Sequence, residues 1–109
     1  MSKGKLVIRD KFEWFSDKDN INITKHGLSF AEIIGVFGDP YFFEIYDANH
    51  SDLNQHRYNG FGCANGKLQI VQVAYTDKNK RTHIISARPA TSRERKLYYD
   101  RVRKIYNEM

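Results

Sequence analysis

The sequence predicts an α+β domain in which a mainly antiparallel sheet packs against helices. Three observations carry this prediction. Two β-rich runs meet at Asn65-Gly66, the dipeptide that best fits a type I′ hairpin turn. Residues 29–37 have a clear helical period, and residues 80–106 read as a strand followed by a basic helix. The expected order of elements is β-α-α-β-β-β-β-α, and residues 1–109 are expected to form a single domain.

The N-terminal part of the chain is predicted to contain extended structure and a polar helix. Residues 6–8 and 12–14 are β-rich and could be two pieces of one edge strand. Ser16 with Asp19 fits the start of a helix over residues 17–26. This helix has few apolar positions, so we expect it to pack weakly.

A second helix is predicted immediately after the first. Gly27 suits the left-handed position that ends a helix, with Leu28 as its hydrophobic partner. Ser29 and Glu32 then form a capping box. Apolar side chains follow at helical spacing, at Phe30, Ile33, Ile34 and Phe37. Residues 38–40, Gly-Asp-Pro, end this helix.

The middle of the chain is predicted to be a meander of strands. The β-rich runs cover residues 41–46, 56–64, 67–76 and 82–88, with a polar loop at 47–55 and a hairpin turn at 77–80. Gly60 and Gly62 interrupt the second run, which indicates a bulge or a close approach of another group to the sheet. Cys63 is expected to be a small core residue.

The last strand is predicted to deliver an arginine to a turn that starts a helix. Pro89 cannot continue a central strand, so Arg88 is expected at the strand end. Thr91 or Ser92 can cap the helix that follows, with Glu94 completing a capping box. The helix should run to about residue 107, with an apolar stripe of Leu97, Tyr98, Val102 and Ile105.

Positive charge is concentrated in the last thirty residues. The chain has a formal net charge of +5, and residues 80–109 contain nine Lys or Arg against three acids. Such a surface favours an anionic partner, although composition alone equally fits a basic surface without a partner. With one cysteine there can be no internal disulfide, and no segment is long and apolar enough for a bilayer. We therefore expect a cytoplasmic protein with no membrane partner.

The side chains that could act in catalysis are mainly basic groups and imidazoles. The four histidines lack zinc-type spacing, and no P-loop, dinucleotide fingerprint or nucleophile elbow occurs, so we expect no metal and no cofactor. Metal-free RNA cleavage needs a base for the ribose 2′-OH, cations for the phosphorane and a proton donor for the leaving 5′-oxygen. Side chains that could serve are Lys25, His26, His50, Arg57, Arg81, His83 and Arg88. Each alone could be an ordinary surface charge, so only their joint placement makes a case.

Several short motifs occur in order between Phe12 and Tyr99. They are Lys25-His26-Gly27-Leu28-Ser29-Phe30, Val36-Phe37-Gly38-Asp39-Pro40, His50-Ser51, and Ile84-Ile85-Ser86-Ala87-Arg88 with Ala90 and Arg93-Glu94-Arg95, together with Trp14, Lys18, Asn22, Asp47, Arg57 and Gly62. Each motif is weak alone, but in combination and in this register the chain resembles the BrnT toxins.

The resemblance implies a compact RelE-like endoribonuclease that arrests translation by cutting RNA through 2′-OH attack, without a metal. It implies the toxin half of a type II toxin–antitoxin pair, neutralised by a cognate BrnA-type antitoxin and able to form a larger complex on operator DNA through that antitoxin. The catalytic residues implied are Lys25, His26, His50, Arg57 and Arg88. The two arginines would stabilise the phosphorane, a histidine would act as base or acid, and Lys25 would contribute charge. Residues expected to hold the RNA backbone are Arg81, His83, Arg93, Arg95 and Lys96.

Three departures from the family pattern leave other functions open. Gln55 and His56 stand where an acid often precedes the arginine at position 57, Phe15 replaces an aspartate, and residues 1–11 form an N-terminal extension. One alternative is a non-catalytic module that binds nucleic acid or protein through the basic C-terminal strand and helix. Another is an interaction partner whose active site has drifted.

Overall fold

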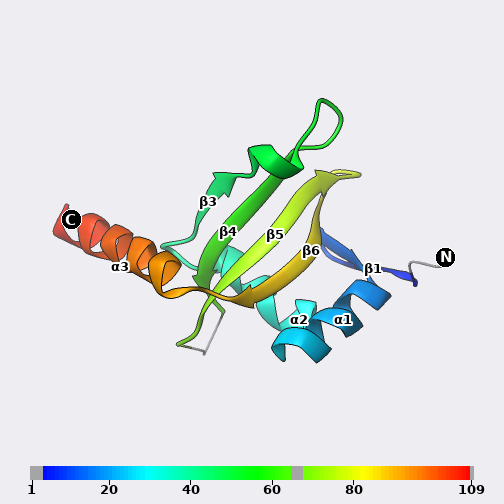
Figure 1. Cartoon of the computed structure of the whole chain (residues 1–109), viewed down its shortest axis with the longest axis horizontal. Coiled ribbons are helices and arrows are strands. Elements are labelled where there is room, and N and C mark those ends of the chain that lie inside the picture. Colours follow the sequence, from blue (N-terminus) through cyan, green and yellow to red (C-terminus); the bar gives the residue numbers. More distant parts are fainter. Residues whose placement is uncertain (1–3, 65–67, 109) are drawn as a thin grey trace.

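A six-stranded sheet forms the centre of the protein (Figure 1). The computed structural model describes residues 4–64 and 68–108, so the predicted turn at Asn65-Gly66 lies outside the described residues. The sheet order is β1-β2-β6-β5-β4-β3. The strands are β1 (Leu6–Arg9), β2 (Phe12–Phe15), β3 (Phe43–Tyr46), β4 (Arg57–Cys63), β5 (Ile70–Lys78) and β6 (Arg81–Pro89).

The helices pack against this mixed, mainly antiparallel sheet, which confirms the α+β class. They are α1 (Ser16–His26), α2 (Phe30–Ile33) and α3 (Ser92–Asn107), with 3₁₀ turns η1 (Ile34–Gly38) and η2 (Ala48–His50). All strand pairs are antiparallel except β2 with β6, which run parallel. Among the residues described, no helix is long and apolar enough to cross a membrane.

The prediction of one N-terminal edge strand is wrong, because the chain reverses at Asp10. This residue has a left-handed φ of 56°, and β1 pairs back onto β2 as a hairpin. Strand β2 then joins the first half of β6, with Glu13 opposite His83. Residues 6–9 of the N-terminal extension therefore form the outer edge of the sheet.

Helix α1 starts at Ser16, but the predicted capping by Ser16 and Asp19 is wrong. The N-cap residue is Phe15, and it makes no side-chain capping bond. The Ser16 hydroxyl instead accepts the Lys5 N–H at 2.9 Å, and the Asp19 carboxylate accepts the Phe30 N–H at 2.8 Å. These two side chains are used to attach neighbouring segments to α1 and not to cap it.

The helix junction between α1 and α2 follows the predicted pattern. Gly27 has a φ of 68°, and its N–H donates to the Ile23 carbonyl at 2.8 Å. Ser29 and Glu32 form both bonds of the capping box. The α-helix lasts only four residues and tightens into η1. This segment packs Phe30, Ile33 and Val36 fully inside the core, with Trp14, Val73 and Ile84 from the sheet.

The sheet has one core face and one face that carries polar groups. Side chains alternate along a strand, and on β5 the residues Val71, Val73 and Tyr75 belong to the core under α2 and η1. Gln72 and Thr76 therefore point to the opposite face. A register shift pairs Ala74 with Ser86 and Tyr75 with Ile84, so Ile85 is an extra residue in β6.

Other groups approach the backbone closely at Gly60 and Gly62, which confirms one of the two predicted alternatives. A Cβ at Gly60 would lie 2.6 Å from the Phe42 ring, and one at Gly62 would lie 3.0 Å from the Val36 carbonyl oxygen. The bulge alternative is wrong for β4, because its register with β3 and β5 is continuous.

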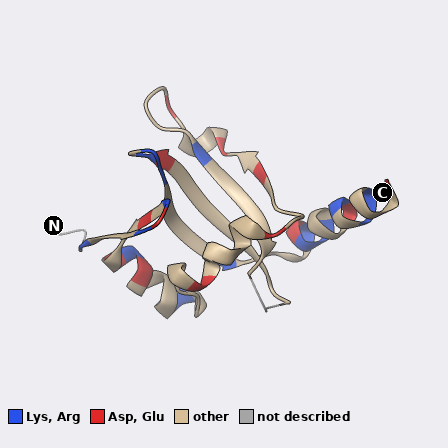
Figure 2. Ribbon diagram, turned by 180° about the vertical axis from the view of Figure 1, so that it is seen from behind, with Lys and Arg blue, Asp and Glu red and all other residues tan. Residues whose placement is uncertain are grey.

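Helix α3 begins with the predicted capping box of Thr91 and Glu94. Tyr98 is buried, and its hydroxyl donates to Asp39 Oδ2 at 2.5 Å. Beyond this anchor the helix projects away from the sheet (Figure 1). Leu97, expected in the apolar stripe, is 46% exposed. Lys and Arg recur along α3 and at the β5–β6 turn (Figure 2).

Candidate active site groove

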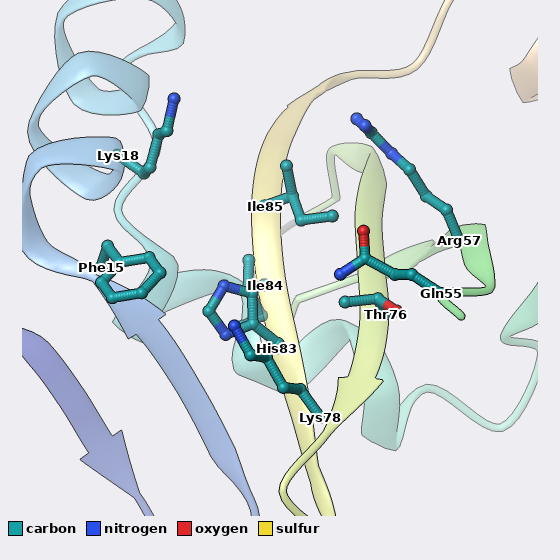
Figure 3. A pocket seen from close by; sticks show the side chains of 9 residues that line it. All are labelled: Phe15, Lys18, Gln55, Arg57, Thr76, Lys78, His83, Ile84 and Ile85. Atoms are coloured by element: carbon teal, nitrogen blue, oxygen red, sulfur yellow. The ribbon is translucent and has the colours of Figure 1, made fainter. Parts of the chain in front are cut away.

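A groove lies on the polar face of the sheet, between α1 and strands β4 to β6. It consists of two hollows of about 310 Å³ and about 300 Å³. Lys18, Arg57 and Ile85 line both hollows, so the two are neighbouring parts of one groove. Figure 3 shows Lys18 reaching in from α1 on one side and Arg57 from β4 on the other, with Ile85 of β6 between them.

Strand pairing aligns four polar side chains across this face. Glu13 of β2 is opposite His83 of β6, His83 is opposite Thr76 of β5, and Thr76 is opposite Arg57 of β4. Residues in register on neighbouring strands share a face. The sheet therefore collects groups that are as much as seventy residues apart in the sequence into one row.

The groove is strongly cationic. Its lining includes Lys18, Lys25, Arg57 and Lys78, with the imidazoles of His26 and His83. Of the described residues that line the two hollows, none is acidic. A concave site lined by one sign of charge concentrates ligands of the opposite sign. This groove is therefore suited to a polyanion.

Arg57 is held firmly at the start of β4. Its backbone N–H donates to Ser51 Oγ at 2.8 Å, and its carbonyl accepts the Asp47 N–H at 2.8 Å. The side-chain Nε is buried and has no hydrogen-bond partner among the described residues. A buried donor is normally paired, so this Nε is an exception, and the Arg57 side chain that carries it lines both hollows of the groove.

His83 is fixed by a buried carboxylate. Its Nδ1 lies 2.7 Å from Glu13 Oε2, and the residues are 7% and 1% exposed. Sequence reasoning missed Glu13 as a site residue. The signal was an acid inside the apolar strand Phe12–Phe15, where burial of a charge needs a partner. Lys18 and Lys78 were also absent from the predicted catalytic and RNA-binding sets.

The structure brings four predicted site residues into the groove: Lys25, His26, Arg57 and His83. Arg81 lies next to it, with Nη1 3.9 Å from Glu13 Oε1. These residues come from α1, β4 and β6, so their proximity depends on the tertiary fold.

His50 and Arg88 do not line the groove. His50 Nδ1 lies 2.9 Å from Asp47 Oδ2, and this hydrogen bond lowers the pKa of Asp47. Asp47 also accepts from Asn59 at 3.3 Å, and Asn59 accepts from Gln72 at 2.7 Å. Because Gln72 is opposite Arg88, His50 and Arg88 lie at the two ends of a polar line that crosses the same face.

Arg88 is engaged by the last helix. Its guanidinium makes two hydrogen bonds to Glu94, at 2.7 and 3.0 Å. These bonds lower the pKa of Glu94 and raise the pKa of Arg88. The predicted RNA-binding residues of α3 also lie outside the groove lining. Arg95 donates to the Ala90 carbonyl, and the remaining two, Arg93 and Lys96, occupy the first two turns.

The arrangement of the groove side chains can bind phosphate and transfer protons. No group of three or more His, Cys, Asp or Glu suited to a metal ion occurs in residues 4–64 and 68–108. Cations can stabilise the charge of a phosphorane, and imidazoles can move protons near neutral pH.

Comparison with known proteins identifies the family. A search of curated proteins finds no match to the chain. A family model described as ribonuclease toxin, BrnT, of type II toxin-antitoxin system matches residues 14–94. This span covers most of the 109 residues and includes α1, the groove strands and the start of α3. The chain therefore belongs to the BrnT family of ribonuclease toxins of type II toxin–antitoxin systems.

Proposed function

We propose that the protein is a metal-independent endoribonuclease that binds the scissile phosphate of RNA in the groove and inhibits translation by cutting messenger RNA. The observation that carries this proposal is the meeting of Lys18, Lys25 and Arg57 with two imidazoles in a groove whose described lining holds no acid. A cationic groove of this kind can hold the RNA backbone and also stabilise the extra charge of the transition state.

The placement of the groove residues supports an in-line reaction. Arg57 lines both hollows, whereas Lys25 and His26 line only one and His83 only the other. With the phosphate bound at Arg57, His26 takes the proton of the ribose 2′-OH as the O2′–P bond forms. The P–O5′ bond breaks on the opposite side, and the leaving 5′-oxygen receives a proton. The products are a 2′,3′-cyclic phosphate and a 5′-hydroxyl.

The other predicted residues contribute outside the groove in this proposal. Arg88 and His50 lie farther along the same face, where they would contact phosphates next to the scissile one. For Arg88 this requires exchange of its Glu94 partner, at 2.7 Å, for the RNA. The residues proposed to hold more distant backbone are Arg81, Arg93, Arg95 and Lys96.

A type II toxin implies an antitoxin, and we propose a BrnA-type antitoxin that masks the groove. The complex would form in the cytoplasm, where the messenger substrate is, and could assemble on operator DNA through the antitoxin. The basic surfaces of α3 and the β5–β6 turn (Figure 2) offer contacts to acidic side chains of such a partner. A RelE-like arrangement of the sheet is part of the same proposal.

The test is expression of wild type, Arg57→Ala and Arg88→Ala in one host, with growth and RNA integrity followed together. Arg9→Ala is the matched control, because Arg9 is an exposed arginine on β1, away from the groove lining. Wild type and Arg9→Ala should stop growth and shorten RNA, whereas Arg57→Ala should do neither. Arrest by a folded Arg57→Ala protein at wild-type level would contradict the proposal.

The basic helix also supports a second function, a non-catalytic module for nucleic acid. Helix α3 carries exposed Arg93, Arg101 and Arg103 and projects beyond the sheet. RNA binding that weakens steeply with salt, while labelled RNA stays intact for hours, would favour this function.

A further inference from the structure

We propose that His83 donates the proton to the leaving 5′-oxygen and that Glu13 is the residue that positions it. This inference rests on the proposed ribonuclease activity and adds the proton donor to it. On sequence alone His83 was one of seven side chains that could serve in RNA cleavage and was assigned to holding the RNA backbone, whereas Glu13 had no assigned role.

The hydrogen bond to Glu13 determines which ring nitrogen of His83 is available. Glu13 Oε2 lies 2.7 Å from Nδ1. An ionised carboxylate can only accept, so Nδ1 carries the hydrogen of this bond. The other nitrogen, Nε2, is then the one available to RNA. The Phe15 ring packs edge-to-face with the imidazole, with centroids 5.2 Å apart, and limits its rotation.

Glu13 is buried beside His83 and has few other partners. It is 1% exposed, and its Oε1 finds no hydrogen-bond partner within the described part of the chain. The nearest cation to Oε1 is Arg81 Nη1, at 3.9 Å. The bond to His83 is therefore the hydrogen bond that holds this buried carboxylate and the imidazole in place.

Three cations share a hollow with His83, namely Lys18, Arg57 and Lys78. A phosphate held by these cations brings the leaving 5′-oxygen into the hollow that His83 lines.

The position of His83 also fits the direction of the reaction. His83 and His26 line different hollows, and Arg57 lines both. In-line displacement requires the attacking and leaving oxygens on opposite sides of the phosphorus. We place His26, which lines one hollow, on the attacking side, and His83, which lines the other hollow with Arg57 (Figure 3), on the side of the leaving oxygen.

A purely structural role is the competing explanation, since the Glu13–His83 bond also joins β2 to β6. The two explanations differ for a substrate whose 5′-bridging oxygen at the cut site is replaced by sulfur. A thiolate leaves without protonation, so loss of a proton donor slows cleavage of the oxygen substrate far more than that of the sulfur substrate. A distorted groove slows both alike.

The experiment measures single-turnover cleavage of both substrates, in whichever context wild type cuts, free RNA or ribosome-bound message. His83→Ala should cut the oxygen substrate at least about 100-fold more slowly than wild type, and the sulfur substrate within a few-fold of it. Glu13→Gln should show the same selective loss, about tenfold or more. His26→Ala is the comparison, because its loss should be equal on both substrates.

Each outcome decides between the explanations. Equal losses on both substrates in folded His83→Ala, or no loss at all, would overturn the proposal. His83→Asn, which keeps a polar side chain opposite Glu13, provides a second variant if alanine unfolds the protein. If wild type cuts neither substrate in either context, the ribonuclease function itself fails, which is a different result from failure of the proton donor.

Discussion

Replacement of Asn22 by alanine should destabilise the protein and disturb the groove, because Asn22 joins α1 to the sheet. Its side-chain Nδ2 donates to the Leu28 carbonyl at 2.9 Å, and its Oδ1 accepts the Ala87 N–H of β6 at 2.9 Å. Asn22 is 4% exposed, and both partners are buried. These two bonds set the distance between β6 and the helix that carries Lys18 and Lys25.

The expected loss follows from the groups left unpaired. Asn22→Ala leaves a buried N–H and a buried carbonyl without partners, at about 1–3 kcal/mol each. The better helix propensity of alanine returns about 0.5 kcal/mol. We expect a net loss of about 1.5–5.5 kcal/mol in the free energy of unfolding, a large part of the roughly 5–15 kcal/mol of a domain.

Urea denaturation followed by circular dichroism measures this loss. Asn20→Ala is the matched control, since Asn20 lies on the same helix and is exposed, and its stability should change by no more than about 0.5 kcal/mol. A stability of Asn22→Ala within about 0.5 kcal/mol of wild type would refute the reasoning that these bonds hold α1 on β6.

Three further predictions concern the sheet, the last helix and the groove. Gly62→Ala places a Cβ 3.0 Å from the Val36 carbonyl oxygen, and should lower the urea midpoint by an amount equivalent to about 1–3 kcal/mol; an unchanged midpoint would contradict that contact. The hydrogen bond from Arg88 lowers the pKa of Glu94, so the stability it provides is present above the ordinary glutamate pKa and is lost as pH falls through the lowered folded value. Glu94→Gln should therefore lower the free energy of unfolding by about 0.5–1 kcal/mol at neutral pH, a figure reduced for solvent exposure, and should not lower it in strong acid. A loss of stability of the same size at both pH values would show another cause. Arg57→Lys keeps the charge but loses the planar fork, and single-turnover cleavage should fall about tenfold, against about 100-fold or more for Arg57→Ala; equal rates for the two variants would argue against a specific guanidinium contact.

The features that the sequence predicted well are local. The stop at Gly27 uses a backbone bond to Ile23, four residues back, and the capping boxes that start at Ser29 and Thr91 each join groups three residues apart. The incorrect prediction of an N-cap at Ser16 also has a physical reason. Its hydroxyl is used by the Lys5 N–H, eleven residues away, and a local pattern does not contain that information.

The groove could be predicted only in part, because strand order determines its composition. The parallel pairing of β2 with β6 brings Glu13 to His83, and a short apolar strand gives no local sign of its distant partner. The sequence pattern likewise did not reveal the partner of Arg88. The pattern assigned Glu94 to the helix cap, which it fills, but the same carboxylate also binds the Arg88 guanidinium.

The central claim is that the groove cuts RNA through the 2′-hydroxyl without a metal, and the most direct measurement is the chemistry of the cut ends. Purified wild type and Arg57→Ala are incubated with messenger RNA, with and without ribosomes, in excess EDTA. The account predicts 2′,3′-cyclic phosphate and 5′-hydroxyl ends from wild type, strongly reduced cutting by Arg57→Ala, and no cutting where the 2′-OH at the site is replaced by hydrogen. Cutting that EDTA abolishes and Mg²⁺ restores, or cutting that persists at the 2′-deoxy position, would contradict it.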